Sequence, residues 1–206
     1  MIRSFTSTRL TAGVLTAGFV CGAAAFCLIC NNASRVAGAD RSGDAVQLAA
    51  EAKPTTAVAV IHSAAANKDK VTGTVTFTET DKGVHIVAEI EGLKPGKHGF
   101  HVHQSADLSA PDLKSAGGHF NPGGAKHGGP DSEVHHAGDL GNLVADEKGH
   151  ATLDRVFPGL SVSGEKDGVI GHSVVIHAGE DDLKSDPAGN SGARIAAGAI
   201  EAAPAK

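Results

Sequence analysis

The chain of 206 residues has no tryptophan, no tyrosine and one methionine, and only three cysteines. All three cysteines, Cys21, Cys27 and Cys30, lie close to the N-terminus. If that segment is removed, the rest of the chain can be neither a thiol enzyme, nor a cysteine-type zinc finger, nor a disulfide scaffold. Aromatic residues make up only 3% of the chain, so few rings are available to stack on nucleic-acid bases.

Acidic residues are absent from the first 39 positions, which contain Arg3, Arg9 and Arg35. The remaining 167 residues therefore carry 15 basic and 23 acidic side chains, a net charge of −8. An acidic body repels phosphate, and we therefore expect no nucleic-acid partner. A segment of this length is suited to one domain with its own core.

The first 39 residues have the features of a signal peptide. Met1–Arg9 is short and positively charged, and Leu10–Cys30 is apolar and uncharged. Ala37-Gly38-Ala39 supplies the small residues that signal peptidase accepts, which predicts cleavage before Asp40. An uncleaved membrane anchor is the alternative, because 21 residues of this kind can span a bilayer. Either way the protein is expected to be exported, to the periplasm or the cell exterior.

The predicted mature chain divides into three parts. Residues 40–55 are polar and alanine-rich and are predicted to be a linker, since any helix there is too short to be stable alone. Residues 56–203 form the expected folded domain. The tail from residue 201 is expected to fray.

Short runs of alternating apolar and polar residues predict β-strands. The expected strands are Thr56–Ser63, Val71–Thr78, Val84–Ile90, Gly99–His103, Gly141–Ala145, Ala151–Val156, Ser173–His177 and Arg194–Ile200. No long helical pattern interrupts them. Strands at this spacing predict an all-β sandwich or closed barrel.

A long irregular stretch from Gln104 to Gly138 separates two of these strands. Seven of the 12 histidines fall within residues 98–139. A loop this long inside a compact domain usually has a function, and something besides a hydrophobic core must order it. Bound metal ions would do so.

Histidines on two predicted strands suggest a metal site. His101 and His103 are two residues apart on one strand, so their side chains point to the same face. A lone pair of this kind is also common on surfaces and in cores, as is a lone histidine such as His177 at the end of another strand. With His119 they make an all-nitrogen set, which suits Cu²⁺.

A second set comprises His119, His127, His136 and Asp139. Three imidazoles and one carboxylate suit tetrahedral Zn²⁺ without a thiolate ligand. His119 belongs to both sets because an imidazole has two ring nitrogens, and one ring can bridge two metals. Spacing alone does not establish that bridge.

The residues of these sets resemble the copper/zinc superoxide dismutase family, especially its bacterial, exported members. The matching strings are GKHGFHVH (96–103), SAGGHFNPGGAKHGGP (115–130), HHAGDLGNLVADEKGHA (135–151), VIGHSVVIH (169–177), DDL (181–183) and GNSGARIAAG (189–198). They extend in order over most of residues 56–200, and together they are highly specific.

The resemblance implies an eight-stranded antiparallel Greek-key β-barrel or sandwich, immunoglobulin-like, with a long metal-binding loop and a short electrostatic loop. It implies dismutation of superoxide to O₂ and H₂O₂ by a redox-cycling copper that is bridged through His119 to a structural zinc. The alternative is a non-catalytic copper- and zinc-binding protein, a buffer or delivery module, on the same fold. Both a monomer and a homodimer stay open, and a membrane partner is expected only if the N-terminal segment is uncleaved.

The family's residue roles transfer by position. The implied copper ligands are His101, His103, His119 and His177, and the implied zinc ligands are His119, His127, His136 and Asp139. Asp181 matches the carboxylate that links His101 to His127. Arg194 matches the arginine that lies beside copper and attracts the anionic substrate, so His119 and Arg194 are the implied catalytic residues.

Four positions depart from the family pattern. Leu113 and Ala197 stand where the family has the two cysteines of its intrachain disulfide, and we hypothesise that their side chains pack together instead. His135 and His172 stand where arginines are common. They are either plain surface substitutions or sites where ion pairs weaken as histidine loses its charge.

Overall fold

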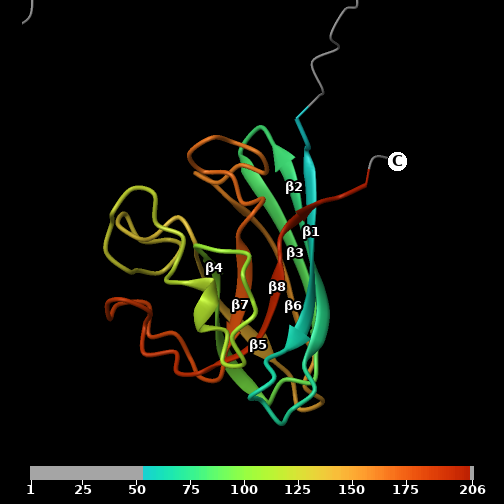
Figure 1. Ribbon diagram of the computed structural model, residues 1–206. Helices are drawn as coiled ribbons and strands as arrows, with labels where there is room; N and C mark the ends of the chain where they lie inside the picture. Colours follow the sequence, from blue (N-terminus) through green and yellow to red (C-terminus); the bar gives the residue numbers. More distant parts are fainter. Residues whose placement is uncertain (1–52, 205–206) are drawn as a thin grey trace, which may run out of the picture. The chain divides into compact units, whose positions relative to one another are not determined.

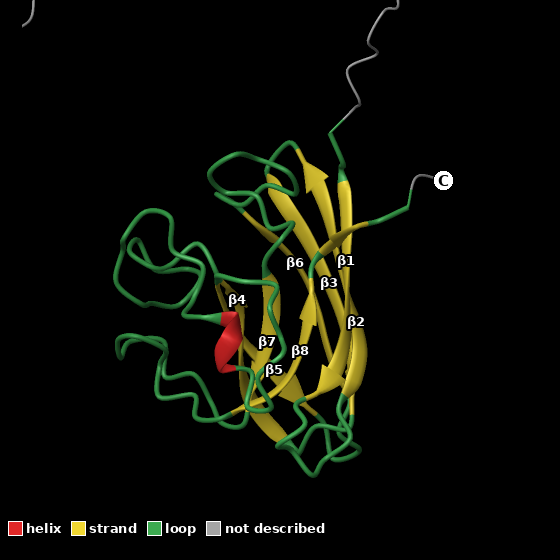
Figure 2. Cartoon of the chain, in the orientation of Figure 1, coloured by secondary structure: helices red, strands yellow, loops and turns green. Residues whose placement is uncertain are grey.

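The computed structural model describes residues 53–204, which form nine β-strands and one short 3₁₀ turn (Figures 1 and 2). The strands are β1 (Thr56–Ser63), β2 (Thr72–Thr80), β3 (Gly83–Glu91), β4 (Gly96–His103), β5 (Asp139–Ala145), β6 (Ala151–Phe157), β7 (Ser173–His177), β8 (Arg194–Ala199) and β9 (Glu201–Ala202), and the turn η1 is Lys114–Ala116. The predicted signal peptide and most of the predicted linker lie outside the described residues. Within residues 53–204, no helix is long and apolar enough to cross a membrane.

Side-chain alternation explains why β2 and β3 pair. Val75 and Phe77 of β2 are fully buried, and their antiparallel partners are Ala88 and Ile86 of β3, which are also fully buried. Successive side chains of a strand point to opposite faces, so these four residues form one apolar face. β2 and β3 therefore form a hairpin, and its inner face supplies a large part of the core.

The strands form one antiparallel sheet in the order β5-β4-β7-β8-β1-β2-β3-β6, with β9 added beside β1. β4 pairs with β5 and β7 and not with β3, because the chain crosses from one end of this order to the other after β3. The two outermost strands, β5 and β6, contact each other without a ladder of hydrogen bonds. The fold is therefore a nearly closed Greek-key barrel, as expected.

Several strand ends differ from the sequence expectation by one to three residues, and two of the differences show the cause. β4 begins at Gly96 and not at Gly99, because the backbone of Gly96 already pairs with Ala145 of β5. The tail does not fray at its start, because Glu201 pairs with Val58 of β1. Both differences arise from pairing between distant segments, which local sequence patterns do not report.

Two long connections lie on the same side of the barrel, residues 104–138 between β4 and β5 and residues 178–193 between β7 and β8 (Figure 1). On β4, Phe100 and Val102 face the core, whereas His101 and His103 point to the opposite face, and all four are buried. The connections cover the outer face of the sheet at these histidines. As expected, residues 104–138 are irregular, with η1 as their one helical turn (Figure 2).

Candidate metal centre

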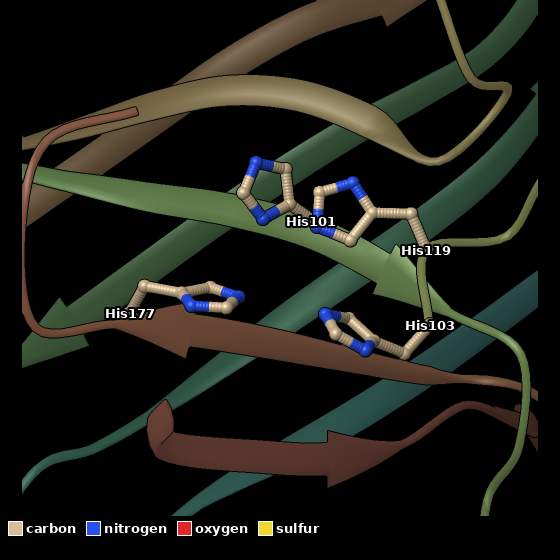
Figure 3. A group of neighbouring side chains, drawn as sticks. All are labelled: His101, His103, His119 and His177. Carbon is tan, nitrogen blue, oxygen red and sulfur yellow. The ribbon is translucent and has the colours of Figure 1, made fainter. Parts of the chain in front are cut away.

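Four histidines converge on the outer face of the barrel (Figure 3). His101 and His103 come from β4, His177 from β7 and His119 from the long loop, where its backbone forms a bridge with His103. One ring nitrogen from each lies within 4.8 Å of the other three. We call these residues the four-histidine group, and all four are buried.

Each ring of the four-histidine group has one nitrogen with a partner and one without. The nitrogens without a hydrogen-bond partner are His101 Nδ1, His103 Nε2, His119 Nε2 and His177 Nε2. Their opposite nitrogens contact the Asp181 carboxylate, the Gly117 carbonyl, the Asp139 carboxylate and the Gly192 carbonyl, respectively. A buried polar atom without a partner costs free energy, and a ring held at its far nitrogen is typical of metal-bound histidine. The group therefore fits a metal ion.

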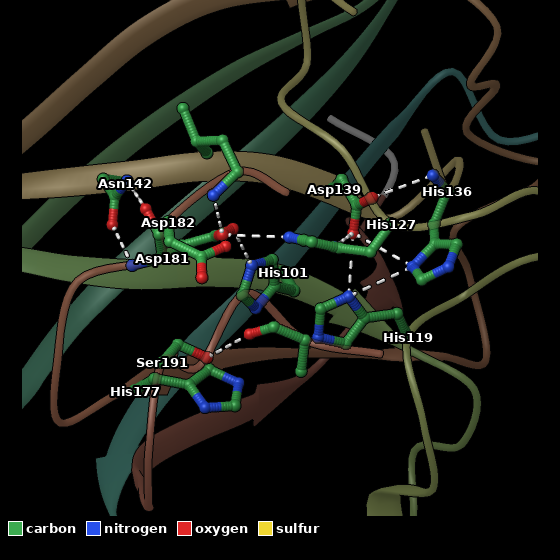
Figure 4. Close-up of polar contacts among 12 residues, drawn as sticks. His101, His119, His127, His136, Asp139, Asn142, His177, Asp181, Asp182 and Ser191 are labelled. Carbon is green, nitrogen blue, oxygen red and sulfur yellow. Dashed lines mark hydrogen bonds and ion pairs between the residues drawn. The ribbon is translucent and has the colours of Figure 1, made fainter. Parts of the chain in front are cut away.

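A second cluster adjoins it, consisting of His119, His127, His136 and Asp139 (Figure 4). We call it the mixed group. Asp139 Oδ1 lies 2.7 Å from Nδ1 of His119, 3.1 Å from Nδ1 of His127 and 3.2 Å from Nδ1 of His136. Tetrahedral Zn²⁺ with bonds of about 2.0–2.1 Å separates its ligand atoms by about 3.3 Å. The spacing of the mixed group therefore fits a zinc ion.

Asp139 is held in the orientation that this cluster needs. Its Oδ2 accepts hydrogen bonds from the backbone N–H groups of Gly128 and His136, which leaves Oδ1 facing the imidazoles. Burial raises the pKa of this carboxyl, but the bonds from His119, His136 and Gly128 outweigh burial and lower the pKa to about 2. Asp139 is therefore a carboxylate at neutral pH.

Burial keeps three members of the four-histidine group, His101, His103 and His177, neutral. It lowers the pKa of His103 to about 2, with the charges of His119 and Arg194 adding to the effect, and it lowers the pKa of His177 to about 4. It also lowers the pKa of His101 well below the ordinary value. Neutral imidazoles offer the lone pairs that a metal requires.

These shifts predict the acid sensitivity of the metal-free protein. His103 and His177 have a pKa of about 6.5 when unfolded and lower values when folded, so their contribution is complete above pH 6.5. It is lost progressively as the pH falls, down to about 4 for His177 and about 2 for His103. Burial lowers the pKa of His127, but Asp181 and Asp139 outweigh it and raise the pKa, which partly offsets this loss. We expect a lower urea midpoint at pH 4.5 than at pH 7.5 for the metal-free chain. An equal or higher midpoint at pH 4.5 would contradict the prediction.

Asp181 joins the two groups. Its Oδ2 lies 2.7 Å from His101 Nε2, and its Oδ1 lies 2.9 Å from His127 Nε2 (Figure 4). Its backbone N–H donates to Asn142, whose side-chain amide donates back to the Asp181 carbonyl. Gly189 closes over the carboxylate at φ +58°, and a Cβ atom there would lie 1.8 Å from Oδ1. Only glycine leaves room for this contact.

Arg194 lies at the start of β8, where it pairs with His177 in the ladder. Its Nη1 donates to the carbonyl of Leu113 and its Nη2 to the carbonyl of Gly117, both at 2.6 Å. The Gly117 carbonyl also accepts the Nδ1–H of His103. Burial lowers the pKa of this half-buried arginine, but a guanidinium stays charged in proteins. A fixed positive charge therefore lies next to the four-histidine group.

The departures from the family pattern have structural counterparts. Leu113 and Ala197 share one buried apolar cluster, which agrees with the hypothesis that they pack together. The ring of His172 packs against Phe120, and the Nδ1 of His135 bonds to a backbone carbonyl. In the described part of the chain, neither histidine forms an ion pair.

Sequence reasoning missed several groups that support the site. Asp186 accepts the backbone N–H of His127 at 2.7 Å, which ties the short loop of residues 183–188 to the mixed group. Asn142 holds Asp181, and the carbonyls of Leu113 and Gly117 hold Arg194. A carbonyl leaves no signal in a sequence. Asp186 is one exposed carboxylate among many until the fold places it.

A barrel that carries two adjoining donor groups and shares His119 between them fits the class of proteins that hold two metal ions. The family model described as copper/zinc superoxide dismutase matches residues 71–200, more than half of the chain. The chain therefore belongs to the copper/zinc superoxide dismutase family.

Individual relatives agree with this placement. The extracellular superoxide dismutase (Cu-Zn) of Drosophila melanogaster is 47% identical over 139 residues, which cover 64% of this chain and 76% of the relative. The protein of the same name from Brugia pahangi is 42% identical over 157 residues, which cover 72% of this chain and 76% of the relative. A crystal structure of the clock protein EA4 superposes with a TM-score of 0.67 at 41% identity and covers 74% of this chain and 97% of that one.

Proposed function

We propose that this protein is an exported copper/zinc superoxide dismutase that converts superoxide to O₂ and H₂O₂. The observation that carries the proposal is the set of buried, unpaired ring nitrogens in the four-histidine group, which adjoins the mixed group through His119. Membership of the family supports both the reaction and the two metals.

In this proposal each metal has its own ligands. Copper is held by His101, His103, His119 and His177, and zinc by His119, His127, His136 and Asp139. When bound, copper supplies one-electron redox chemistry, whereas zinc does not change its oxidation state and maintains geometry. His119 belongs to both donor groups, and its Nε2, when it is free of metal, would hold a proton for peroxide formation.

Two further residues orient the proposed ligands and attract the substrate. Asp181 fixes the rings of His101 and His127 through its two carboxylate oxygens. Arg194 supplies a positive charge for an anionic substrate in a domain whose expected net charge is −8. Attraction of a small anion depends on the local field and not on the net charge.

Export is supported by two observations. The N-terminal 39 residues have the pattern of a signal peptide, and the relatives from Drosophila melanogaster and Brugia pahangi are named extracellular enzymes. We propose cleavage before Asp40 and release from the membrane.

One experiment tests the proposal. The chain is expressed with its own N-terminus, and protein recovered from outside the cytoplasm is sequenced and assayed for superoxide decay, with copper and zinc counted in the same sample. We expect an N-terminus at Asp40 and a fast, copper-dependent rate at one copper and one zinc per chain. Full metal content without a rate would favour the metal-buffer alternative, and retention in the cytoplasm would contradict export.

A further inference from the structure

Leu113 has a backbone conformation that leucine rarely adopts. Its φ of 59° and ψ of 18° place it in the left-handed region, just before η1. A residue with a Cβ atom is strained in this region, so the surrounding structure must hold it there. The contacts of its side chain and its carbonyl show what does so.

The side chain is buried in a small apolar cluster, separate from the main core. Its other buried members are Ala64, Ala116, Val175 and Ala197, and Leu108 packs against it while staying partly exposed. Val175 belongs to β7 and Ala197 to β8. Leu113 therefore anchors the long loop to the two strands that carry His177 and Arg194.

The carbonyl of Leu113 points at Arg194. It accepts Nη1 of the guanidinium, while the carbonyl of Gly117, at the far end of η1, accepts Nη2. The two carbonyl oxygens, which we call the carbonyl pair, therefore hold both terminal nitrogens of one side chain from the two ends of a single turn. Leaving the left-handed region would rotate the peptide that follows Leu113 and turn its carbonyl away.

We propose that Leu113 is a positioning residue for Arg194. Its buried side chain holds the left-handed backbone, the backbone aims the carbonyl, and the carbonyl fixes the guanidinium beside the four-histidine group. The effect on turnover rests on the proposed dismutase function, but the effect on Arg194 itself does not.

The test uses the full chain loaded with both metals and two variants at this position. Leu113→Ala removes most of the anchor, and Leu113→Val keeps apolar bulk but has a branched Cβ that resists the left-handed region. Leu108→Ala is the matched control, because Leu108 packs against the same cluster and donates no group to Arg194. The first readout is the rate at which phenylglyoxal, an arginine reagent, modifies Arg194, followed by mass spectrometry.

Both Leu113 variants are expected to speed modification of Arg194 by about three- to tenfold and to lower the dismutation rate by a similar factor at unchanged metal content, since small misplacements have effects of this size or larger. Leu108→Ala is expected to change neither. In an Arg194→Ala background, Leu113→Ala should have no further effect on the rate, because the group that it positions is absent. If Leu113→Ala fails to fold, the reactivity of Arg194 in Leu113→Val decides whether the positioning role holds.

Failure of the positioning role and failure of the proposed function would give different results. Unchanged Arg194 reactivity in a folded Leu113 variant would overturn the positioning role, whether or not the parent chain turns over. An equal loss of rate with and without Arg194 would also overturn it, since it would show a general structural defect. A metal-loaded parent without dismutase activity would defeat the proposed function, and faster modification of Arg194 in the variants would still support the positioning role.

Discussion

Replacing His119 with alanine is expected to lower the copper-dependent dismutation rate by more than about 100-fold while copper stays bound. Even partners outside the ligand set typically contribute about 10–100-fold to metal affinity or activity, and His119 belongs to both donor groups. Three imidazoles, those of His101, His103 and His177, remain to hold copper. The variant loses the link between the groups and the Nε2 that can hold a proton.

The measurement is superoxide decay with copper and zinc counted in every sample. His136→Ala is the matched control, because His136 belongs to the mixed group but not to the four-histidine group. We expect it to lose zinc affinity with a much smaller loss of rate per bound copper. His150→Ala, at an exposed histidine outside both groups, should behave as the parent does. A similar loss in the His119 and His136 variants would show that sharing between the groups is not the cause.

Removing both metals is expected to lower the midpoint of thermal unfolding by about 8–16 °C. A ligand at 1,000 times its dissociation constant stabilises the folded state by about 4 kcal/mol, and each kcal/mol shifts the midpoint of a domain of this size by about 2–4 °C. In the described part of the chain, the proposed metal ligands include five buried ring nitrogens without hydrogen-bond partners. Without metal, these nitrogens face one another and destabilise the fold.

Calorimetry of chelated and reloaded protein measures this difference. Zinc alone should restore most of it, because His119, His127 and His136 lie on the irregular connection of residues 104–138. Asp139→Asn, which removes the carboxylate of the mixed group, should shrink the gap between the metal-free and metal-loaded midpoints. His150→Asn should leave that gap intact. Equal midpoints with and without metal in the parent would contradict the idea that metals order the loop.

Most of the fold could be predicted because its strands alternate. In β2 and β3, apolar residues at every second position define one buried face, and two strands, Thr56–Ser63 and Ser173–His177, have the predicted bounds. The pattern did not predict the order of the strands, nor that β4 would lie beside β7. Strand order depends on which faces bury each other, which one strand's sequence does not contain.

The candidate site likewise has parts that the sequence predicts and parts that it does not. The ligands were named from residue type, spacing and family resemblance, because imidazole and carboxylate are chemically distinctive side chains. The groups that hold them were not, since Asn142, Asp186 and the carbonyl pair are ordinary residues or backbone atoms. The sequence shows Leu113 at a position where the family has a cysteine, but its left-handed backbone and its contact with Arg194 follow from no sequence pattern.

The sequence by itself determined that this is an acidic, histidine-rich β protein with candidate ligands for two metals. These properties reside in side-chain chemistry and in alternation along the chain. Only the tertiary structure decided that His119 contacts both groups, that Asp181 joins them and that two backbone carbonyls aim Arg194. These relations are distances and directions between segments up to 81 residues apart, and they exist only once the barrel brings β4, β7, β8 and the long loop together.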